Sequence, residues 1–503
     1  MKIVNYKLAL IVSAGLLLFA SCKKSFLDTF PTTAVAATDA VASTQNGYAA
    51  LNGIHRIMYV QYDQQGENGE GSNNIFRDLM GEDIVYPLAN GSTGLIGFMQ
   101  WTSHRNVNSV DLRYVYRYYY RIIANANVLI AGIDAATGPD ADKKIIKGQS
   151  LAYRAWAHFQ LVQLWGKRYV AGAQNTQPGV PLLLTNDLAG QPRATVEEVY
   201  TQVNKDLDEA ATLLTGYNRN LGGTGGTNSS AKSNWNVNVV QGMKARVAMA
   251  QQNYALAATS AAAARTGFTL MTNAEYLTGF NNTSNQEWMW GSKQISDHNT
   301  FFYSYFAYIS CNFNSTVIRT QPRAINATLW NAIPSTDIRK QCWDLTGASV
   351  PVPPGGARVP YQNKKYMAAS ADLSIGDVPY MRTAEMYLIE AEARARQGGQ
   401  DAAARTALFT LLSNRNPSYV LSTNSGDALI NEIMFHRRVE FWGEGFRFTD
   451  LKRLNQAMSR EGIPNHLPAL ISVTVVPAGD IKWEWLFPQD EINANPAIVQ
   501  NPL

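Results

Sequence analysis

The sequence predicts a mainly α protein, in which tetratricopeptide-like helix pairs form a scaffold that carries long irregular loops and a small C-terminal β-hairpin. Two observations predict this fold class. Several long segments repeat apolar residues at helical spacing and are joined by short turns, and two extended regions show no periodicity. With 46% hydrophobic residues, the 503-residue chain can bury a sizeable core. Its net charge of +4, without a clustered basic excess, excludes an obvious nucleic-acid-binding protein.

Residues 1–21 are predicted to be a lipoprotein signal peptide. Lys2 and Lys7 precede an uncharged run from Leu8 to Ala20, which is too short to span a bilayer as a helix. The small residues directly before Cys22 resemble a bacterial lipobox, in which the cysteine thiol is acylated after cleavage. We therefore expect lipidation at Cys22 and attachment to a membrane through that lipid. An ordinary secretory signal with an incidental cysteine is the alternative.

Residues 22–503 are expected to form one domain. Apolar residues at steps of three or four from Val41 onward predict a helix over about 41–58. Thr195 and Glu198 form a capping-box pattern that opens another helix. Similar patterns predict further helices over about 107–133, 141–165, 237–265, 382–397, 400–414 and 426–442. The predicted helical scaffold covers about 38–265 and 380–460.

Two irregular regions, about 62–106 and 266–380, are expected to bear the ligand. Long loops inside a compact domain are usually functional or contain short elements. Near the C-terminus, residues 472–476 and 481–487 flank a Pro-Ala-Gly-Asp turn, which predicts a β-hairpin.

Aromatic side chains in these irregular regions are the candidate ligand-binding residues. Sugar rings present C–H faces that stack on flat aromatic rings, and their hydroxyls require polar groups nearby. The candidates are Trp101, Asp83 and Arg105 in the first region and Tyr305, Trp330 and Trp343 in the second, with Trp101 and Trp330 as leading stacking residues. Burial in the core is the alternative for each ring. The tryptophans expected to be structural are Trp156, Trp165, Trp288, Trp290, Trp483 and Trp485.

Paired carboxylates are the only pattern that suggests catalysis. Glu440 and Glu444 would share a helix face, where two carboxylates could serve as a glycosidase acid and nucleophile. Because Arg437, Arg438 and Arg447 surround them in sequence, we interpret the pair as part of a structural ion-pair network. The same interpretation applies to Glu385, Glu390 and Glu392. No catalytic residue is predicted.

Metal, cofactor and disulfide sites receive little support from the sequence. The six histidines form neither an HxH nor an HExxH pattern, so neither a metal site nor a cofactor is expected. Cys311 and Cys342 could form a disulfide or remain as buried thiols, and both interpretations stay open.

Three segments in the last third of the chain resemble one protein family. Pro379–Ala393 contains an Arg, then Ala-Glu, then Ala-Glu-Ala. His436–Arg453 reads HRRVEFWGEGFRFTDLKR and resembles an Arg-Arg-x-Glu, Glu-Gly-x-Arg and Asp-Leu-x-Arg signature. Leu486–Pro502 resembles a terminal series of Pro, Glu, Asn-Pro and Gln-Asn-Pro. On these motifs the chain is similar to the SusD/RagB family of Bacteroidetes outer-membrane lipoproteins.

The resemblance implies a SusD-like helical scaffold with an irregular ligand-bearing face. It implies a non-catalytic, glycan-binding protein that sits as a lid on a SusC-like TonB-dependent transporter. It also implies a lipid-anchored location at the outer membrane, facing the cell surface. Surface-exposed members often carry acidic residues after the lipidated cysteine, whereas Lys23 and Lys24 follow Cys22, so periplasmic facing stays open. Capture of a peptide or another non-glycan nutrient, and glycoside hydrolysis, stay open as alternative functions.

Overall fold

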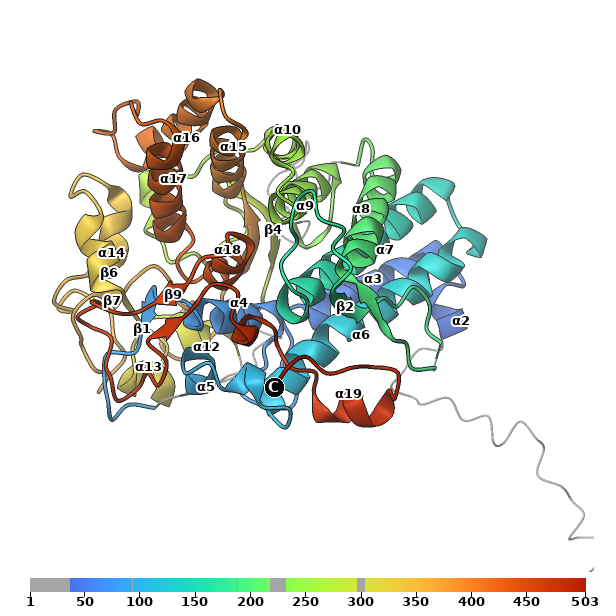
Figure 1. The fold of residues 1–503 in the computed structure, drawn as a ribbon, viewed down its shortest axis with the longest axis horizontal. Helices are drawn as coiled ribbons and strands as arrows, with labels where there is room; N and C mark the ends of the chain where they lie inside the picture. The colour runs from blue at the N-terminus through green and yellow to red at the C-terminus, as the bar shows by residue number, and fades with distance from the viewer. Residues whose placement is uncertain (1–36, 93, 188, 218–231, 296–303) are drawn as a thin grey trace, which may run out of the picture.

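The computed structural model describes residues 37–92, 94–187, 189–217, 232–295 and 304–503, so the predicted signal peptide and Cys22 lie outside the described residues. The fold is mainly helical, as the sequence predicts (Figure 1). The longer helices are α3 (Thr44–Ile57), α4 (Gly69–Leu79), α6 (Val110–Gly132), α7 (Asp140–Trp165), α8 (Val196–Leu213), α9 (Val237–Ala250), α10 (Tyr254–Ala264), α15 (Thr383–Gln397), α16 (Asp401–Arg415) and α17 (Gly426–Glu440). Shorter helices are α2 (Ala37–Ala40), α5 (Ile96–Met99), α11 (Asn273–Tyr276), α12 (Tyr305–Ile309), α13 (Thr316–Thr320), α14 (Ala327–Ala332), α18 (Arg447–Arg453) and α19 (Gln489–Ala494).

Consecutive helices pack in pairs. Helix α7 packs on α8, α9 on α10, and α15 on α16. Helix α10 also packs on α15, which joins the N-terminal helices to the C-terminal ones. The paired helices therefore follow one another in a row from α3 to α16, as the tetratricopeptide-like prediction requires (Figure 1).

Side-chain caps fix where several helices begin. Thr195 and Glu198 form the predicted capping box at the start of α8. The prediction of one helix over 237–265 is wrong, because the chain breaks between α9 and α10. Gln252 adopts a left-handed φ of 61°, and the side chain of Asn253 accepts a hydrogen bond from the Leu256 amide to begin α10.

The irregular region at 62–106 contains a helix that the sequence did not predict. All residues of α4 are buried, including Glu70, Arg77 and Asp78. The strongly apolar residues of this 11-residue helix are Ile75, Phe76 and Leu79, all in its second half. The apolar spacing repeated over many turns that reveals α6 and α7 is therefore absent here.

The strands form small antiparallel sheets. The largest has the order β1 (Ile84–Val85), β5 (Ala324–Ile325), β7 (Gln362–Asn363), β6 (Trp343–Asp344), and two further pairs join β2 (Pro178–Pro181) to β3 (Arg193–Thr195) and β4 (Trp288–Ser292) to β8 (Val378–Arg382). The predicted C-terminal hairpin is wrong. Strand β10 (Val475–Val476) pairs with β9 (Met458–Ser459), and Ile481–Trp483 forms a 3₁₀ turn that Asp480 caps.

The core confirms the structural interpretation of six tryptophans. It buries Trp156, Trp165, Trp288, Trp290, Trp483 and Trp485. Cys311 and Cys342 are both buried as free thiols, so the two cysteines do not form a disulfide. Burial raises the pKa of each thiol to about 12.

Candidate ligand-binding site

The two irregular regions meet at the four-stranded sheet. Ile84 pairs with Ile325 and Val85 with Ala324, so β1 of the first region lies beside β5 of the second. The Leu88 amide donates to the Gln321 side chain at 3.0 Å, which extends this contact beyond the strands. The two regions that are expected to bear the ligand therefore lie side by side at this sheet.

Trp330 is the predicted stacking residue that remains accessible on this surface. Its ring is only partly buried and is carried by α14, whose N-terminus is capped by the Asn326 side chain. The ring packs edge-on against Tyr361 at 5.4 Å, and the Lys340 ammonium lies 4.2 Å from its centroid. The indole Nε1 donates to the Lys340 carbonyl at 3.3 Å. These contacts hold an amphipathic ring in place beside a partly buried tyrosine and a cation, which is the combination a sugar ring needs.

Three other predicted aromatic candidates are buried, which corrects the expectation that they are exposed. Trp101 is 2% exposed, and its indole donates to the Met80 carbonyl at 2.9 Å. Tyr305 is equally buried, and its hydroxyl donates to the Gly443 carbonyl at 2.7 Å. Trp343 is 3% exposed and packs edge-on against Trp442. None of these rings offers a face to a ligand in this structure.

The two charged candidates hold chain segments together. Asp83 is buried and forms an ion pair with Arg438 at 2.5 Å. Arg105 donates to the carbonyls of Glu484 at 2.7 Å and Pro502, which ties the first irregular region to the C-terminal tail. The polar atoms of both side chains bond to other groups of the protein. The expectation that they face a ligand is therefore also corrected.

Glu440 and Glu444 lie in a buried ion-pair network, as the sequence interpretation predicts, but their partners come from elsewhere in the chain. The neighbouring arginines, Arg437, Arg438 and Arg447, pair instead with Asp450, Asp83 and Glu82. Glu440 accepts from Arg382 at 2.9 Å, from Arg415 at 3.1 Å and from Arg339 at 3.3 Å. Glu444 pairs with Arg382 and Lys365. The guanidinium groups hold the pKa of Glu440 well below its usual range, although burial alone would raise it. A glycosidase acid must hold a proton near neutral pH, which this carboxylate does not.

The smaller glutamate set is also paired. Glu385 pairs with Arg246, Glu390 with Arg265 and Arg394, and Glu392 with Arg396 and Arg453. Most of these partners lie on other elements, so the pairs connect α15 to α9, α10 and α18.

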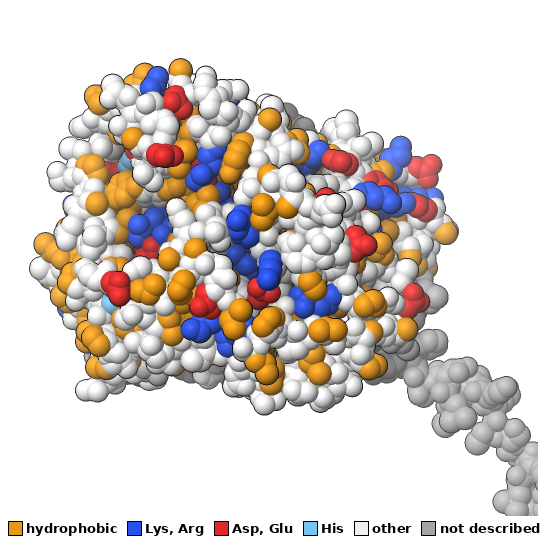
Figure 2. All heavy atoms as spheres, viewed as in Figure 1, with side chains coloured by type: hydrophobic (Ala, Val, Ile, Leu, Met, Phe, Trp, Pro, Cys, Tyr) orange, Lys and Arg blue, Asp and Glu red, His pale blue; other side chains and the backbone are white. Residues whose placement is uncertain are grey.

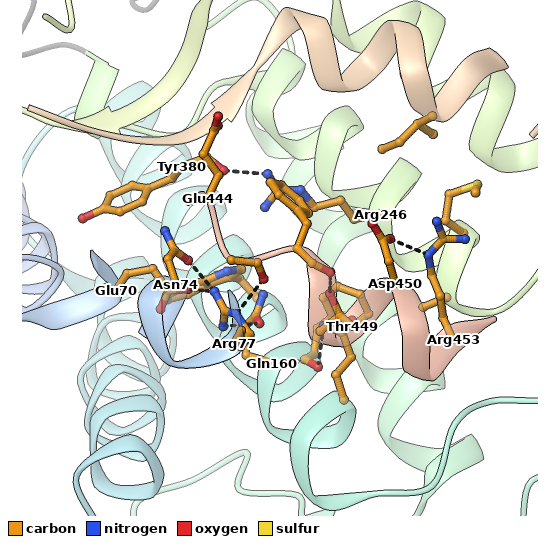
Figure 3. A pocket seen from close by; sticks show the side chains of 18 of the residues that line it. Glu70, Asn74, Arg77, Gln160, Arg246, Tyr380, Glu444, Thr449, Asp450 and Arg453 are labelled. Carbon is orange, nitrogen blue, oxygen red and sulfur yellow. Dashed lines mark hydrogen bonds and ion pairs between the residues drawn. The ribbon is translucent and has the colours of Figure 1, made fainter. Parts of the chain in front are cut away.

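A central polar cavity lies where α4, α7 and the α17–α18 connection meet (Figure 3). Its volume is about 70 Å³. Glu70, Asn74 and Gln160 surround the Arg77 guanidinium (Figure 3). Arg77 donates to them at 2.7, 2.5 and 3.1 Å, respectively. A cavity of this size holds a few water molecules, and its charged groups are already paired. We therefore assign it a structural role.

The described part of the chain offers no group of three or more His, Cys, Asp or Glu side chains that could hold a metal ion. Within the same residues, no helix has the length and apolar character needed to cross a membrane.

Family models show which protein family the chain belongs to. A model of the SusD family matches residues 249–503. The chain belongs to the SusD family. A second family model, described as starch-binding and associating with the outer membrane, matches residues 58–221. Residues 436–453 supply Glu440, Glu444 and Arg453 to the buried ion pairs described above, so this segment stabilises the scaffold.

Solved structures agree with this membership. A SusD-like carbohydrate-binding protein from Bacteroides vulgatus is 25% identical, with 91% of this chain and 97% of that chain covered at a TM-score of 0.78. A SusD superfamily protein from Bacteroides thetaiotaomicron is 22% identical, with 92% and 100% covered at a TM-score of 0.75. A laminarin-binding SusD-like protein is 19% identical, with 92% and 99% covered at 0.70. At 22% and 19% identity, the last two structures establish a shared fold and nothing more. A search of the curated proteins finds no match.

Proposed function

We propose that this SusD-family protein binds an oligosaccharide at the outer membrane and delivers it to a SusC-like TonB-dependent transporter. The observation that carries the proposal is the 25% identity, over most of both chains, to a SusD-like carbohydrate-binding protein. The starch-binding description of the second family model supports the same ligand class. The partly exposed Trp330 beside Tyr361 and Lys340 is the proposed stacking surface.

The proposal includes attachment through a lipid on Cys22, with the protein facing the cell surface. A lipid anchor would hold the binding surface next to a membrane-embedded transporter, so that captured ligand meets the transporter at high effective concentration.

A panel of oligosaccharides and peptides tests the ligand class. Calorimetric titration with α-glucan, β-glucan and mannan fragments is expected to find a binder, while a mixed tripeptide library is expected to give no heat. Binding of peptides alone would replace the glycan proposal with non-glycan nutrient capture. Release of reducing ends from a bound glycan would instead support the hydrolase alternative.

Co-purification from native membranes tests the transporter partnership. Mild detergent extraction is expected to recover the protein with a SusC-like β-barrel. Recovery as a free monomer, with the cognate barrel intact in the same extract, contradicts this part of the proposal.

A further inference from the structure

A second, larger cleft lies between the segment after α7 and two C-terminal segments. Residues 167–177 form one wall, and residues 451–456 and 479–484 form the other. The cleft has a volume of about 340 Å³, which falls within the range of small-molecule sites. It shares no lining residue with the Trp330 surface. Figure 2 shows Lys and Arg side chains gathered near the middle of this face, where Figure 1 places α18 beside α7.

Lys452 ties the second wall of the cleft to the end of α7, which leads into the first wall. Its ammonium donates to the carbonyls of Gln163 and Trp483, each at 2.7 Å. The side chain of Asn175 binds the backbone of Val170 and Ala173, which fixes the loop on the opposite wall. Both walls are therefore formed before any ligand arrives.

Glu484 is the residue that points to a ligand. It is 7% exposed and lines the cleft. Within the described chain its carboxylate receives no hydrogen bond, and the charges of Arg105, Arg193 and Lys452 act on it only at longer range. Because neither carboxylate oxygen is fully buried, a donor group on a bound molecule can reach them.

The rest of the lining offers both donors and acceptors without partners. On one wall, the side chains of Lys167 and Arg168 make no ion pair or hydrogen bond with described residues. On the other, Asn455 and Gln456 are exposed, and their side-chain amides are likewise unengaged by the described residues. Trp483 adds an apolar ring to the lining.

We propose that this cleft is a second saccharide subsite, which takes one or two sugar rings. Each sugar hydroxyl both donates and accepts, so one ring can donate to Glu484 and accept from Lys167 or Arg168 across the cleft. The inference adds a site to the proposed function and rests on that function only for the class of ligand.

Fluorine NMR of protein labelled with 5-fluorotryptophan tests this subsite. The probes are maltose, cellobiose and laminaribiose at millimolar concentration, and glycylglycine represents amine-bearing ligands. Trp483→Phe assigns the reporter resonance. At least one disaccharide is expected to shift that resonance, and Trp330→Ala is expected to leave the shift unchanged.

Two variants test the proposed contacts. Glu484→Gln and Lys167→Ala should each weaken the disaccharide response about 10–100-fold, as expected for hydrogen bonds to a charged group. Lys167 is exposed, so its variant tests the site even if Glu484→Gln unfolds. Glu461→Gln, at an exposed position outside the cleft, is the matched control and should bind normally.

The outcomes separate this inference from the proposed function. A disaccharide that shifts the Trp330 resonance but never that of Trp483 overturns the second subsite and leaves the proposed function standing. A Trp483 response to glycylglycine alone, or one that neither cleft variant weakens, also overturns the saccharide assignment.

Discussion

Arg382 and Glu440 form an ion pair of 2.9 Å in the centre of the protein, and neither side chain is exposed. Arg339 and Arg415 also bond to the same glutamate, and Glu287, Asp337 and Glu444 supply the further carboxylates that balance the three guanidinium groups. Because Glu440 and the three arginines lie on different elements, the network joins β8, α16, α17 and the 338–342 turn.

Glu440→Ala should destabilise the protein strongly. Removing one partner from a buried network leaves the remaining charges without compensation, which typically costs about 3–5 kcal/mol. Chemical denaturation followed by tryptophan fluorescence measures the loss. Glu461→Ala, at an exposed position, should change the free energy of unfolding by less than about 0.5 kcal/mol. Equal stability of the two variants would contradict the assigned role of the network.

Gly445→Ala tests the backbone of the SusD signature. Gly445 has a φ of 85°, and a Cβ there would lie 2.6 Å from the Asn74 Cα. Left-handed strain and a clash with backbone together predict a cost of about 2–5 kcal/mol. Gly398, with a φ of 72° and no atom within 4 Å of its Cβ position, is the matched control. Gly398→Ala should cost only the strain, about 1 kcal/mol, so similar melting temperatures for both variants would contradict the clash.

The scaffold could be predicted from the sequence where helices are amphipathic or capped locally. The prediction of 141–165 matches α7, and the capping box at Thr195 is present, because both signals depend on residues close in sequence. Helix α4 could not be predicted, because its buried polar groups depend on tertiary contacts. Glu70 pairs with Arg77 inside the helix, and the distant Gly445 carbonyl and Tyr119 hydroxyl complete the hydrogen bonds of Arg77.

The ligand-binding candidates were harder to predict, because exposure depends on distant contacts. Trp101 is covered by Trp483 and Phe448, which come much later in the chain. Trp101 also adopts a left-handed φ of 58°, which a tryptophan in the sequence does not predict. In the sequence, Trp330 looks the same as Trp101, since each is an aromatic residue in an irregular region. In the structure, however, Trp330 stays partly exposed.

Trp330→Ala should weaken glycan binding and leave stability nearly unchanged. Loss of a stacking ring removes about 1–3 kcal/mol, or about 5–150-fold in affinity, by analogy with stacking on nucleic-acid bases. Trp101→Ala should do the reverse, since emptying a buried indole site costs about 3–5 kcal/mol of stability. Calorimetry and thermal unfolding measured on both variants distinguish these outcomes. Unaltered glycan affinity in folded Trp330→Ala would remove this ring from the binding surface.

Cys22 should be the first residue of the mature protein and should carry acyl chains. Intact mass of detergent-extracted protein is expected to lack residues 1–21 and to include added lipid mass. Cys22→Ala should release the protein from the membrane fraction, because the anchor is lost. An unmodified Cys22 in membrane-extracted protein would show that the cysteine is incidental.

Asp78 provides a test of stability against pH. Its carboxylate accepts from the amides of Gly445 at 2.9 Å and Arg447 at 3.2 Å, contacts that favour the charged form. Burial acts in the opposite direction and is the larger effect, and it raises the pKa of Asp78 from 3.8 to about 7. The Asp83 carboxylate also raises this pKa, whereas the Arg77 guanidinium lowers it.

Asp78→Asn should remove part of the pH dependence of unfolding. Because the folded-state pKa is raised, the native protein binds this proton more tightly than the unfolded chain does. The stabilisation is complete below pH 3.8 and is lost as pH rises through about 7. The free-energy difference between wild type and Asp78→Asn should therefore fall with rising pH across this window, by up to about 4 kcal/mol. Urea titrations at intervals from pH 4 to 8 measure it, and a difference independent of pH would mean that Asp78 is ionised throughout.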